Sequence, residues 1–268
     1  MNVREAAVVL AGAGVASPEH DARALAAHLL GCRPAEVTLR EGDLDQERYD
    51  DLVARRAQRV PLQHLVGSVG FRWTELLVGP GVFVPRPETE VVVDWAIPHL
   101  AAGSVVVDLC TGSGAIAKSI ATEVPGTVVH AVEKASAAMD WARRNLEGTG
   151  VVLHHCPVLE TPTALDGLVD LVISNPPYVP FSSATRMEPE VLDHDPHVAL
   201  FAEDDGLAVV REVEQVARRL LRPGGLVVVE HDDSQRESAQ RVFAEWVDVA
   251  DHDDLTGRPR FVTARWSG

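Results

Sequence analysis

A strand, a glycine turn and a helix follow one another between Ser104 and Ala121, and this order sets the fold class. Strand and helix patterns then alternate toward the end of the chain. Such alternation predicts an α/β fold with a mostly parallel sheet and helices on both faces. The expected segments after the turn are 136–146, 151–154, 167–174, 207–221, 225–230 and 234–246, with an edge strand at 260–266.

The turn after the first of these strands, residues 110–114, favours close approach of the backbone to a nucleoside. It lacks the spacing of the dinucleotide fingerprint, and no Gly-Lys-Ser/Thr follows, which disfavours pyrophosphate binding. The next expected strand, residues 128–132, leads into Glu133, at about the distance where an acidic residue meets a ribose hydroxyl pair. Two alternatives stay open: Glu133 as a solvated strand-end acid, and Asp108 as an acceptor of backbone N–H groups in the turn.

Asn175-Pro176-Pro177-Tyr178 follows the apolar run 168–174, at the carboxyl end of another expected strand. Open α/β sheets bind their ligands at this edge. Because proline has no N–H, Pro176 offers a carbonyl acceptor, while Asn175 adds a side-chain oxygen and Tyr178 an aromatic face. The motif therefore favours a pocket for a planar NH2 group, against the alternative of an ordinary strand-ending turn.

A glycine turn, a ribose acid and Asn-Pro-Pro-Tyr together are what an S-adenosylmethionine-dependent methyltransferase of amino groups needs. Nearly end to end, the chain resembles the peptide chain release factor glutamine methyltransferase family, which methylates the side-chain amide nitrogen of the glutamine in the release factor Gly-Gly-Gln loop. The further motifs that carry the resemblance are 55–57, 61–67, 81–90, Glu188-Pro189-Glu190, Asp205-Gly206-Leu207, 221–225 and 254–261.

The resemblance implies a seven-stranded Rossmann-like class I methyltransferase sheet with an antiparallel final strand. Before it, apolar residues at helical spacing predict a small helical domain, which by resemblance helps to bind the release factor. The alternative role of this domain is a stabilising cap on the catalytic core. We expect the helical domain at 1–66, a β-hairpin connector at 67–87 and the methyltransferase domain at 88–268.

The motifs and the family together imply roles for individual residues. The catalytic residues are expected to be Asn175, Pro176 and Tyr178, and no metal site is predicted. The substrate amide is expected against the whole Asn-Pro-Pro-Tyr motif, with Phe83 and Arg86 as wall residues; a purely structural role for Arg86 is the alternative. S-adenosylmethionine, which leaves as S-adenosylhomocysteine, is expected beside Asp108, Cys110, Thr111, Gly112, Ser113, Gly114, Glu133 and Asn175, and Pro177 completes the substrate set.

The sequence departs from the family pattern at several strand ends. Cys110 stands where the family usually has glycine, and Lys134-Ala135 replaces a commoner acidic or polar pair. His155-Cys156-Pro157 lies where many relatives carry an aspartate that faces the adenine amino group. Residues 231–235 keep only part of a glycine-containing turn. The changes at Cys110 and Lys134-Ala135 are compatible with the family pattern, while weaker cofactor binding or a diverged substrate is the alternative that the other departures leave open.

Composition restricts the partners. The formal charge of −16 opposes association with nucleic-acid phosphates. Three cysteines without a CxxC pair indicate a reducing compartment, and no apolar run reaches membrane-spanning length, so we expect a cytoplasmic protein with no direct nucleic-acid or membrane partner. Arg55, Arg56 and Arg59 form a local basic patch, either a partner contact or, as we favour for most of them, a solvated helix face.

Two other functions compete with glutamine methylation. Methylation of adenine N6 in nucleic acid also uses Asn/Asp-Pro-Pro-Tyr to hold an amino group, but the negative charge and the lack of a basic recognition domain disfavour it. A relative that binds the cofactor but has lost catalysis is the non-enzymatic alternative.

Overall fold

The computed structural model describes residues 1–180, 189–203 and 205–268, which form two compact units. The first unit contains the N-terminal residues to Ser68, together with 78–80 and a segment described from Pro189 to Asp195. All other described residues belong to the second unit. The domain boundaries expected from sequence stay predictions. Each unit contains segments that are separate in sequence, so cutting the chain at single points does not give these units. Glu188 of the Glu-Pro-Glu motif lies outside the described residues.

The first unit is helical, as its apolar spacing predicts. Its first helix begins at a capping box formed by Asn2 and Glu5, and its second ends at Gly31, whose φ of 56° is left-handed. The hydroxyl of buried Tyr49 donates to the Ala22 carbonyl at 2.9 Å inside the apolar core. The helices of this unit are α1 (Val3–Gly12), α2 (Pro18–Leu30), α3 (Val37–Arg40), α4 (Gln46–Ala57), α5 (Leu62–Val66) and α9 (Pro189–His194).

The basic patch expected on one helix spans α4 and the turn after it, where Arg59 lies, and is largely internal to this unit. Arg56 is 6% exposed; its Nε donates to Asp21 Oδ2 at 2.7 Å and its Nη2 to Glu190 Oε1 at 2.8 Å. Arg59 Nε donates to the same Glu190 oxygen at 2.7 Å. A solvated face is therefore the wrong interpretation for Arg56 and Arg59, because two carboxylates from α2 and α9 hold them, whereas Arg55 is half exposed.

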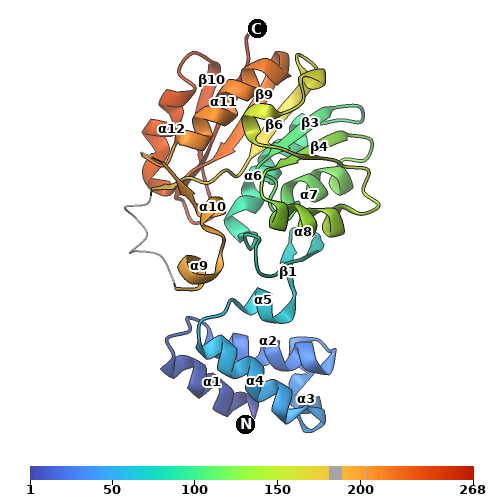
Figure 1. Cartoon of the computed structure of the whole chain (residues 1–268), viewed down its shortest axis with the longest axis vertical. Coiled ribbons are helices and arrows are strands. Elements are labelled where there is room, and N and C mark those ends of the chain that lie inside the picture. Colours follow the sequence, from blue (N-terminus) through green and yellow to red (C-terminus); the bar gives the residue numbers. More distant parts are fainter. Residues whose placement is uncertain (181–188, 204) are drawn as a thin grey trace. The chain divides into compact units, whose positions relative to one another are not determined.

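The second unit is built on a seven-stranded sheet, which confirms the predicted α/β class (Figure 1). The strand order is β10-β11-β9-β6-β3-β4-β5; β3, β4, β5, β6 and β9 are parallel, and β11 is antiparallel to both of its neighbours. The strands are β3 (Val105–Leu109), β4 (Val128–Glu133), β5 (Val152–His155), β6 (Val169–Ser174), β9 (Leu221–Glu230), β10 (Val247–Asp253) and β11 (Pro259–Arg265).

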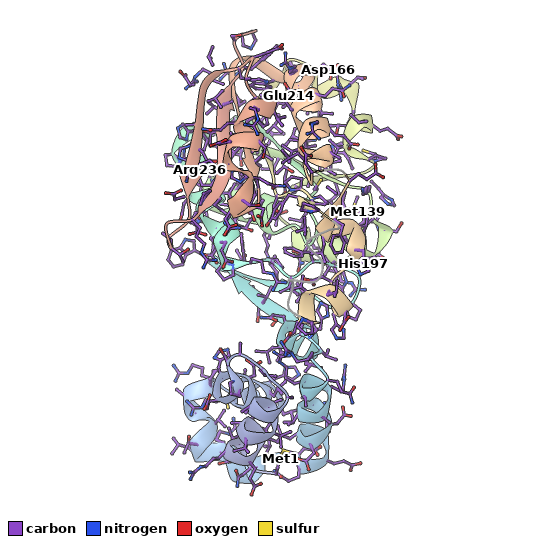
Figure 2. The ribbon with its side chains drawn as sticks, turned by 90° about the vertical axis from the view of Figure 1, so that its left-hand side faces the viewer. Met1, Met139, Asp166, His197, Glu214 and Arg236 are labelled. Carbon is purple, nitrogen blue, oxygen red and sulfur yellow. The ribbon has the colours of Figure 1, made fainter. Side chains whose placement is uncertain are left out.

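Helices cover both faces of this sheet, as the alternating pattern predicts (Figure 1). One face packs against α11 (Ala208–Leu220) and α12 (Arg236–Val242), the helices marked by Glu214 and Arg236 in Figure 2. The other packs against α6 (Glu90–Ala96), α7 (Ala115–Glu123) and α8 (Ser136–Leu146). Alternate residues of β3, such as Val106 and Val107, enter the two apolar cores in turn.

The last strand is not the edge strand that its sequence suggests. β11 lies between β9 and β10, and β10 forms the edge. The sequence interpretation missed β10. Its residues are mostly polar and only partly buried, so no clear apolar alternation marks it as a strand. The predicted antiparallel final strand is confirmed.

Two small sheets and a short helix complete the described strands and α-helices of the second unit. Within the expected connector, β1 (Ser68–Phe71) and β2 (Thr74–Leu77) pair across Arg72 and Trp73. The second small sheet pairs β7 (Val179–Pro180) with β8 (Phe201–Ala202), which follows α10 (His197–Leu200). Among the described helices, none combines the length and the apolar character that crossing a membrane requires.

Candidate active site

Four parallel strands end in one row and bring the predicted motifs together. Ser174, the last residue of β6, pairs with Leu109 of β3 and Val229 of β9, and Leu109 pairs with Val132 of β4. The residues one step further along these strands are therefore neighbours at the carboxyl edge of the sheet. They are Cys110 after β3, Glu133 at the end of β4, Asn175 after β6 and Glu230 at the end of β9.

Glu133 and the glycine turn are joined directly. Glu133 is buried, and its Oε2 accepts the Gly112 N–H at 2.9 Å while Oε1 accepts the Ala135 N–H at 2.8 Å. The alternative of a solvated acid is therefore wrong. Gly112 has a φ of 57°, and a Cβ added there meets no atom within 4 Å, so the turn leaves open space beside its backbone. Gly114 instead packs under α8, since an added Cβ would lie 3.0 Å from Leu146.

Asp108 supports this turn from below. Its Oδ2 accepts the Thr111 hydroxyl at 2.5 Å and the Ala117 N–H at 3.2 Å, while the buried Oδ1 has no hydrogen-bond partner among the described residues. Burial raises the pKa of Asp108 to about 7 despite these donors. Asp108 thus accepts a backbone N–H group, as in the alternative that the sequence left open. Ser113 is buried in the same turn, and its carbonyl accepts from Asn145 at 2.9 Å.

Asn175 and Tyr178 are held by different partners on neighbouring elements. Asn175 Nδ2 donates to the Thr89 hydroxyl at 3.0 Å, and the Tyr178 hydroxyl donates to Glu230 Oε1 at 3.0 Å. Pro176 and Pro177 are buried, whereas Asn175 and Tyr178 are each partly exposed. Thr89 belongs to the turn η3 (Pro87–Thr89), which the Pro-Arg-Pro-Glu-Thr-Glu motif forms before α6. The two most specific motifs of the sequence therefore meet.

Glu230 is the site residue that the sequence interpretation missed. It is 1% exposed, and burial raises its pKa to about 7, although the hydrogen bond from Tyr178 and the positive charge of Arg260 act to lower it. A signal was available, because Glu230 ends an expected strand beside the strand that leads to Asn175. The same rule that located the other motifs at strand ends would have found it.

The backbone carbonyl of Tyr178 is held by close packing. Gln235 Nε2 donates to the Tyr178 carbonyl at 3.0 Å and to the Asp205 carbonyl at 3.1 Å. Gly206 has a φ of 83°, and a Cβ added there would lie 2.3 Å from the backbone carbonyl oxygen of Tyr178. The Asp-Gly-Leu motif and the partial turn at 231–235 thus support the backbone of the Asn-Pro-Pro-Tyr segment.

Known proteins are similar to this chain in sequence over almost its whole length. The family described as PrmC N-terminal domain matches residues 3–67, and the family described as Methyltransferase small domain matches residues 80–193. The release factor glutamine methyltransferase of Streptomyces coelicolor is 54% identical over 271 residues, which cover 98% of this chain and 96% of that protein. The chain belongs to the release factor glutamine methyltransferase family.

Two further similarities extend the family comparison. The 4-amino-L-phenylalanine/4-methylamino-L-phenylalanine methyltransferase of Streptomyces pristinaespiralis is 39% identical over 89% of this chain and 85% of that protein. The solved 16S rRNA N2 G1207 methyltransferase of Thermus thermophilus, in complex with AdoMet and guanosine, matches 75% of this chain and 44% of that chain with 18% identity and a TM-score of 0.50. That structural likeness shows the fold alone.

The expected wall residues Phe83 and Arg86 and the position after β5 also have described contacts. The Arg86 guanidinium lies 5.0 Å from the centre of the Phe83 ring, and both side chains are partly exposed. After β5, the Cys156 N–H donates to the Glu133 carbonyl at 3.1 Å, and the Cys156 side chain packs against the apolar core. The backbone after β5, where the sequence analysis expected the family's adenine-facing aspartate, is therefore tied to Glu133.

Proposed function

We propose that this chain transfers a methyl group from S-adenosylmethionine to the side-chain amide nitrogen of the glutamine in the Gly-Gly-Gln motif of a peptide chain release factor. The observation that carries the proposal is the orientation of Asn175. Its NH2 group is committed to Thr89, so its Oδ1 is the atom left to accept hydrogen bonds from a substrate. The full-length likeness to a release factor glutamine methyltransferase supports the choice of substrate.

The chemistry requires positioning rather than a strong base. An amide nitrogen is a poor nucleophile because its lone pair is delocalised into its carbonyl. Acceptors at Asn175 Oδ1 and the Pro176 carbonyl would hold both N–H bonds, localise electron density on nitrogen and aim it at the methyl carbon. Positive charge grows on that nitrogen during transfer, so the same two acceptors bind the transition state more tightly than the ground state. Tyr178 would lie against the planar amide.

The residues at the row of strand ends fit S-adenosylmethionine, which supplies an electrophilic methyl group on a sulfonium. The space beside Gly112 admits a ligand close to the backbone. Glu133 accepts one backbone N–H at each carboxylate oxygen, and each oxygen retains a second lone pair for a ribose hydroxyl. Asp108 and Thr111 hold the turn in shape from below.

The test is methyl transfer from S-adenosylmethionine labelled in its methyl group. Purified protein is incubated with an intact release factor and, as matched control, with the same factor carrying alanine in place of the Gly-Gly-Gln glutamine. Label in the first and none in the second is expected. Label that appears in DNA but in neither factor would support adenine methylation, and label in no acceptor despite cofactor binding would support a relative without catalysis.

A cofactor variant checks the ribose assignment separately. Replacing Glu133 by alanine removes two acceptors for ribose and frees the Gly112 and Ala135 N–H groups. We expect the affinity for S-adenosylhomocysteine, measured by calorimetry, to fall by at least about tenfold, which corresponds to about 1.4 kcal/mol. Unchanged affinity would contradict the assigned role.

A second candidate function is N-methylation of a small aromatic amine. The relative from Streptomyces pristinaespiralis, named for two aminophenylalanine substrates, favours it, because an aromatic NH2 is planar and donates two hydrogens as an amide does. Including 4-amino-L-phenylalanine in the labelling experiment separates the two candidates. Transfer to this amine without transfer to the release factor would replace the first proposal.

A further inference from the structure

Gln235 is a buried side-chain amide whose oxygen and nitrogen are both engaged. It is 5% exposed and ends the short 3-10 helix η8 (Asp233–Gln235), which follows β9. Its Oε1 accepts the Asp232 N–H at 2.9 Å, while its Nε2 donates to the carbonyls of Tyr178 at 3.0 Å and Asp205 at 3.1 Å. Because an amide nitrogen carries two hydrogens, both are committed. The oxygen thus serves the turn to which Gln235 belongs, and the nitrogen serves two other segments.

The surroundings of the Tyr178 carbonyl leave room for this contact. Gly206 has a left-handed φ of 83°, and a Cβ added there would lie 2.3 Å from the Tyr178 carbonyl oxygen and 2.7 Å from Gln235 Nε2. Any side chain at this position would occupy the place where the donor and the acceptor meet. An amide from η8 and a missing side chain before α11 therefore converge on one backbone oxygen.

The Asn-Pro-Pro-Tyr segment needs an anchor of this kind. Pro176 and Pro177 have no N–H, so the middle of the segment cannot be held through backbone donors of its own. At one end, Ser174 is paired within the sheet. At the other end, Gln235 holds the Tyr178 carbonyl. The Pro176 carbonyl, one of the two acceptors assigned to the substrate, lies in the chain between these two fixed points.

The Tyr178 residue is held at both of its ends as a result. Gln235 binds its backbone carbonyl, and its hydroxyl donates to Glu230 Oε1 at 3.0 Å. Without the Gln235 contact the backbone end is released, so the ring and the carbonyl before it can shift relative to the other strand ends. A displacement of about 1 Å is enough to slow a reaction by about hundredfold.

We propose that Gln235 is a positioning residue for methyl transfer, whose NH2 group fixes the Tyr178 backbone and so holds the Pro176 carbonyl and the Tyr178 ring where the substrate NH2 is received. This inference rests on the proposed function, which assigns those two groups to the substrate amide. Gln235 need not touch the substrate, since both of its NH2 hydrogens are engaged. Its effect belongs to the rate of transfer rather than to cofactor binding.

The kinetic experiment separates the two ends of the Gln235 amide. Gln235→Glu keeps an oxygen for the Asp232 N–H but cannot donate when ionised, and Gln235→Met keeps the length of the side chain without a donor. At a temperature where each variant is folded, both should lower kcat by about tenfold to hundredfold, with a smaller rise in the KM for release factor and unchanged affinity for S-adenosylhomocysteine. Ser234→Ala is the matched control, because the Ser234 hydroxyl donates to Asp232 Oδ1 at 2.6 Å within the same turn. This control should keep the wild-type rate.

A spectroscopic measurement tests the contact without any substrate. The chain has two tyrosines, Tyr49 and Tyr178, so protein grown with tyrosine that carries carbon-13 at its carbonyl gives two carbonyl signals. Tyr49→Phe identifies one signal by removing it. Gln235→Met should shift the Tyr178 signal upfield, because a carbonyl resonance moves in that direction when its oxygen loses a hydrogen bond. Ser234→Ala should leave both signals in place.

Three results overturn the inference. An unmoved Tyr178 signal in Gln235→Met shows that the amide does not hold this carbonyl. Wild-type kcat in both Gln235 variants shows that the contact supports only the fold. A loss of rate in Ser234→Ala equal to that in Gln235→Met assigns the effect to the turn instead. Failure of the proposed function is distinct, because the wild type itself then transfers no label to release factor; if it methylates another amino group, kcat is compared with that acceptor.

Discussion

Partly buried Glu190 in the helical unit and the fully buried carboxylates at the carboxyl edge of the sheet have opposite surroundings. In the helical unit, Glu190 receives hydrogen bonds from Arg56 and Arg59; although burial acts to raise its pKa, these partners hold the pKa below its usual range. At the sheet edge, Asp108 accepts hydrogen bonds from a hydroxyl and a backbone N–H, and Glu230 accepts one from the Tyr178 hydroxyl. Burial raises the pKa of both carboxyl groups to about 7.

The difference separates a scaffold from a site. A buried carboxylate with arginine partners is satisfied by the protein itself, and removing one partner leaves an uncompensated charge. At the sheet edge, Asp108 and Glu230 each keep one buried oxygen without a hydrogen-bond partner among the described residues. Such groups add little to the stability of the fold. Carboxyl groups with perturbed pKa values are concentrated at ligand-binding and catalytic sites. The comparison predicts that substitutions at the sheet edge lower activity. Substitutions of the arginine partners in the helical unit should instead lower stability.

The largest effect is expected for Asn175→Ala, at the sheet edge. The substitution removes one acceptor for the substrate amide and leaves the cofactor residues of β3 and β4 in place. We expect kcat to fall by about 10²- to 10³-fold, in the range measured for loss of one preorganised transition-state group. Affinity for S-adenosylhomocysteine and the free energy of unfolding should change little. Turnover near wild type would show that Asn175 does not hold the substrate.

The helical unit should show the opposite pattern in Arg56→Met. The change keeps much of the side-chain volume but leaves Asp21 without its 2.7 Å partner and weakens the hold on Glu190. We expect the free energy of unfolding to fall by about 3–5 kcal/mol in denaturant titrations. The neighbouring Arg55→Met is the matched control: Arg55 is half exposed and 3.9 Å from Asp51, so a change within about 0.5 kcal/mol is expected. Equal effects of the two variants would remove the distinction.

The pH dependence of stability should carry both signs. A carboxyl group whose pKa is raised by folding stabilises most below its unfolded pKa, and the contribution is lost as pH rises through the folded value. For Asp108 and Glu230 this window lies between about pH 4 and pH 7, at about 1.4 kcal/mol per unit of pKa difference. For Glu190, whose pKa is lowered, the contribution is present above its unfolded pKa and is lost only as pH falls below it.

The measurement is the free energy of unfolding at pH 5 and pH 8 for the wild type and for Glu230→Gln. The wild type should be less stable at pH 8, and the variant should lose less between the two values because one of the two titrating groups is absent. An identical loss in both proteins would mean that Glu230 keeps an ordinary pKa when folded.

The sequence predicted the elements that carry a strong local pattern and missed those defined by a neighbour. The strand, glycine turn and helix from Ser104, and the motif that begins at Asn175, are local patterns, and they lie where expected. Glu230 ends a strand like several other acids in the chain, and only the pairing of β6 with β9 places it beside Asn175. The burial of Arg56 depends on Glu190, which is 134 residues away in sequence and belongs to the same unit. Spacing along the chain contains no information on such contacts.

Cys110→Gly is the smallest expected effect and tests whether the sheet edge stores backbone strain. Cys110 has a φ of 63°, a left-handed value that costs a residue with a Cβ about 1 kcal/mol, and it stands where the family usually has glycine. Glycine removes this cost, but it loses the packing of the partly buried side chain and gains freedom in the unfolded chain. The opposing contributions should leave the free energy of unfolding within about 1 kcal/mol of wild type. Because the turn already has its left-handed form, affinity for S-adenosylhomocysteine should be unchanged. A large loss of affinity would show instead that the Cys110 side chain takes part in cofactor binding, and Cys110→Ala, which keeps the Cβ without the sulfur, would identify the thiol as the group responsible.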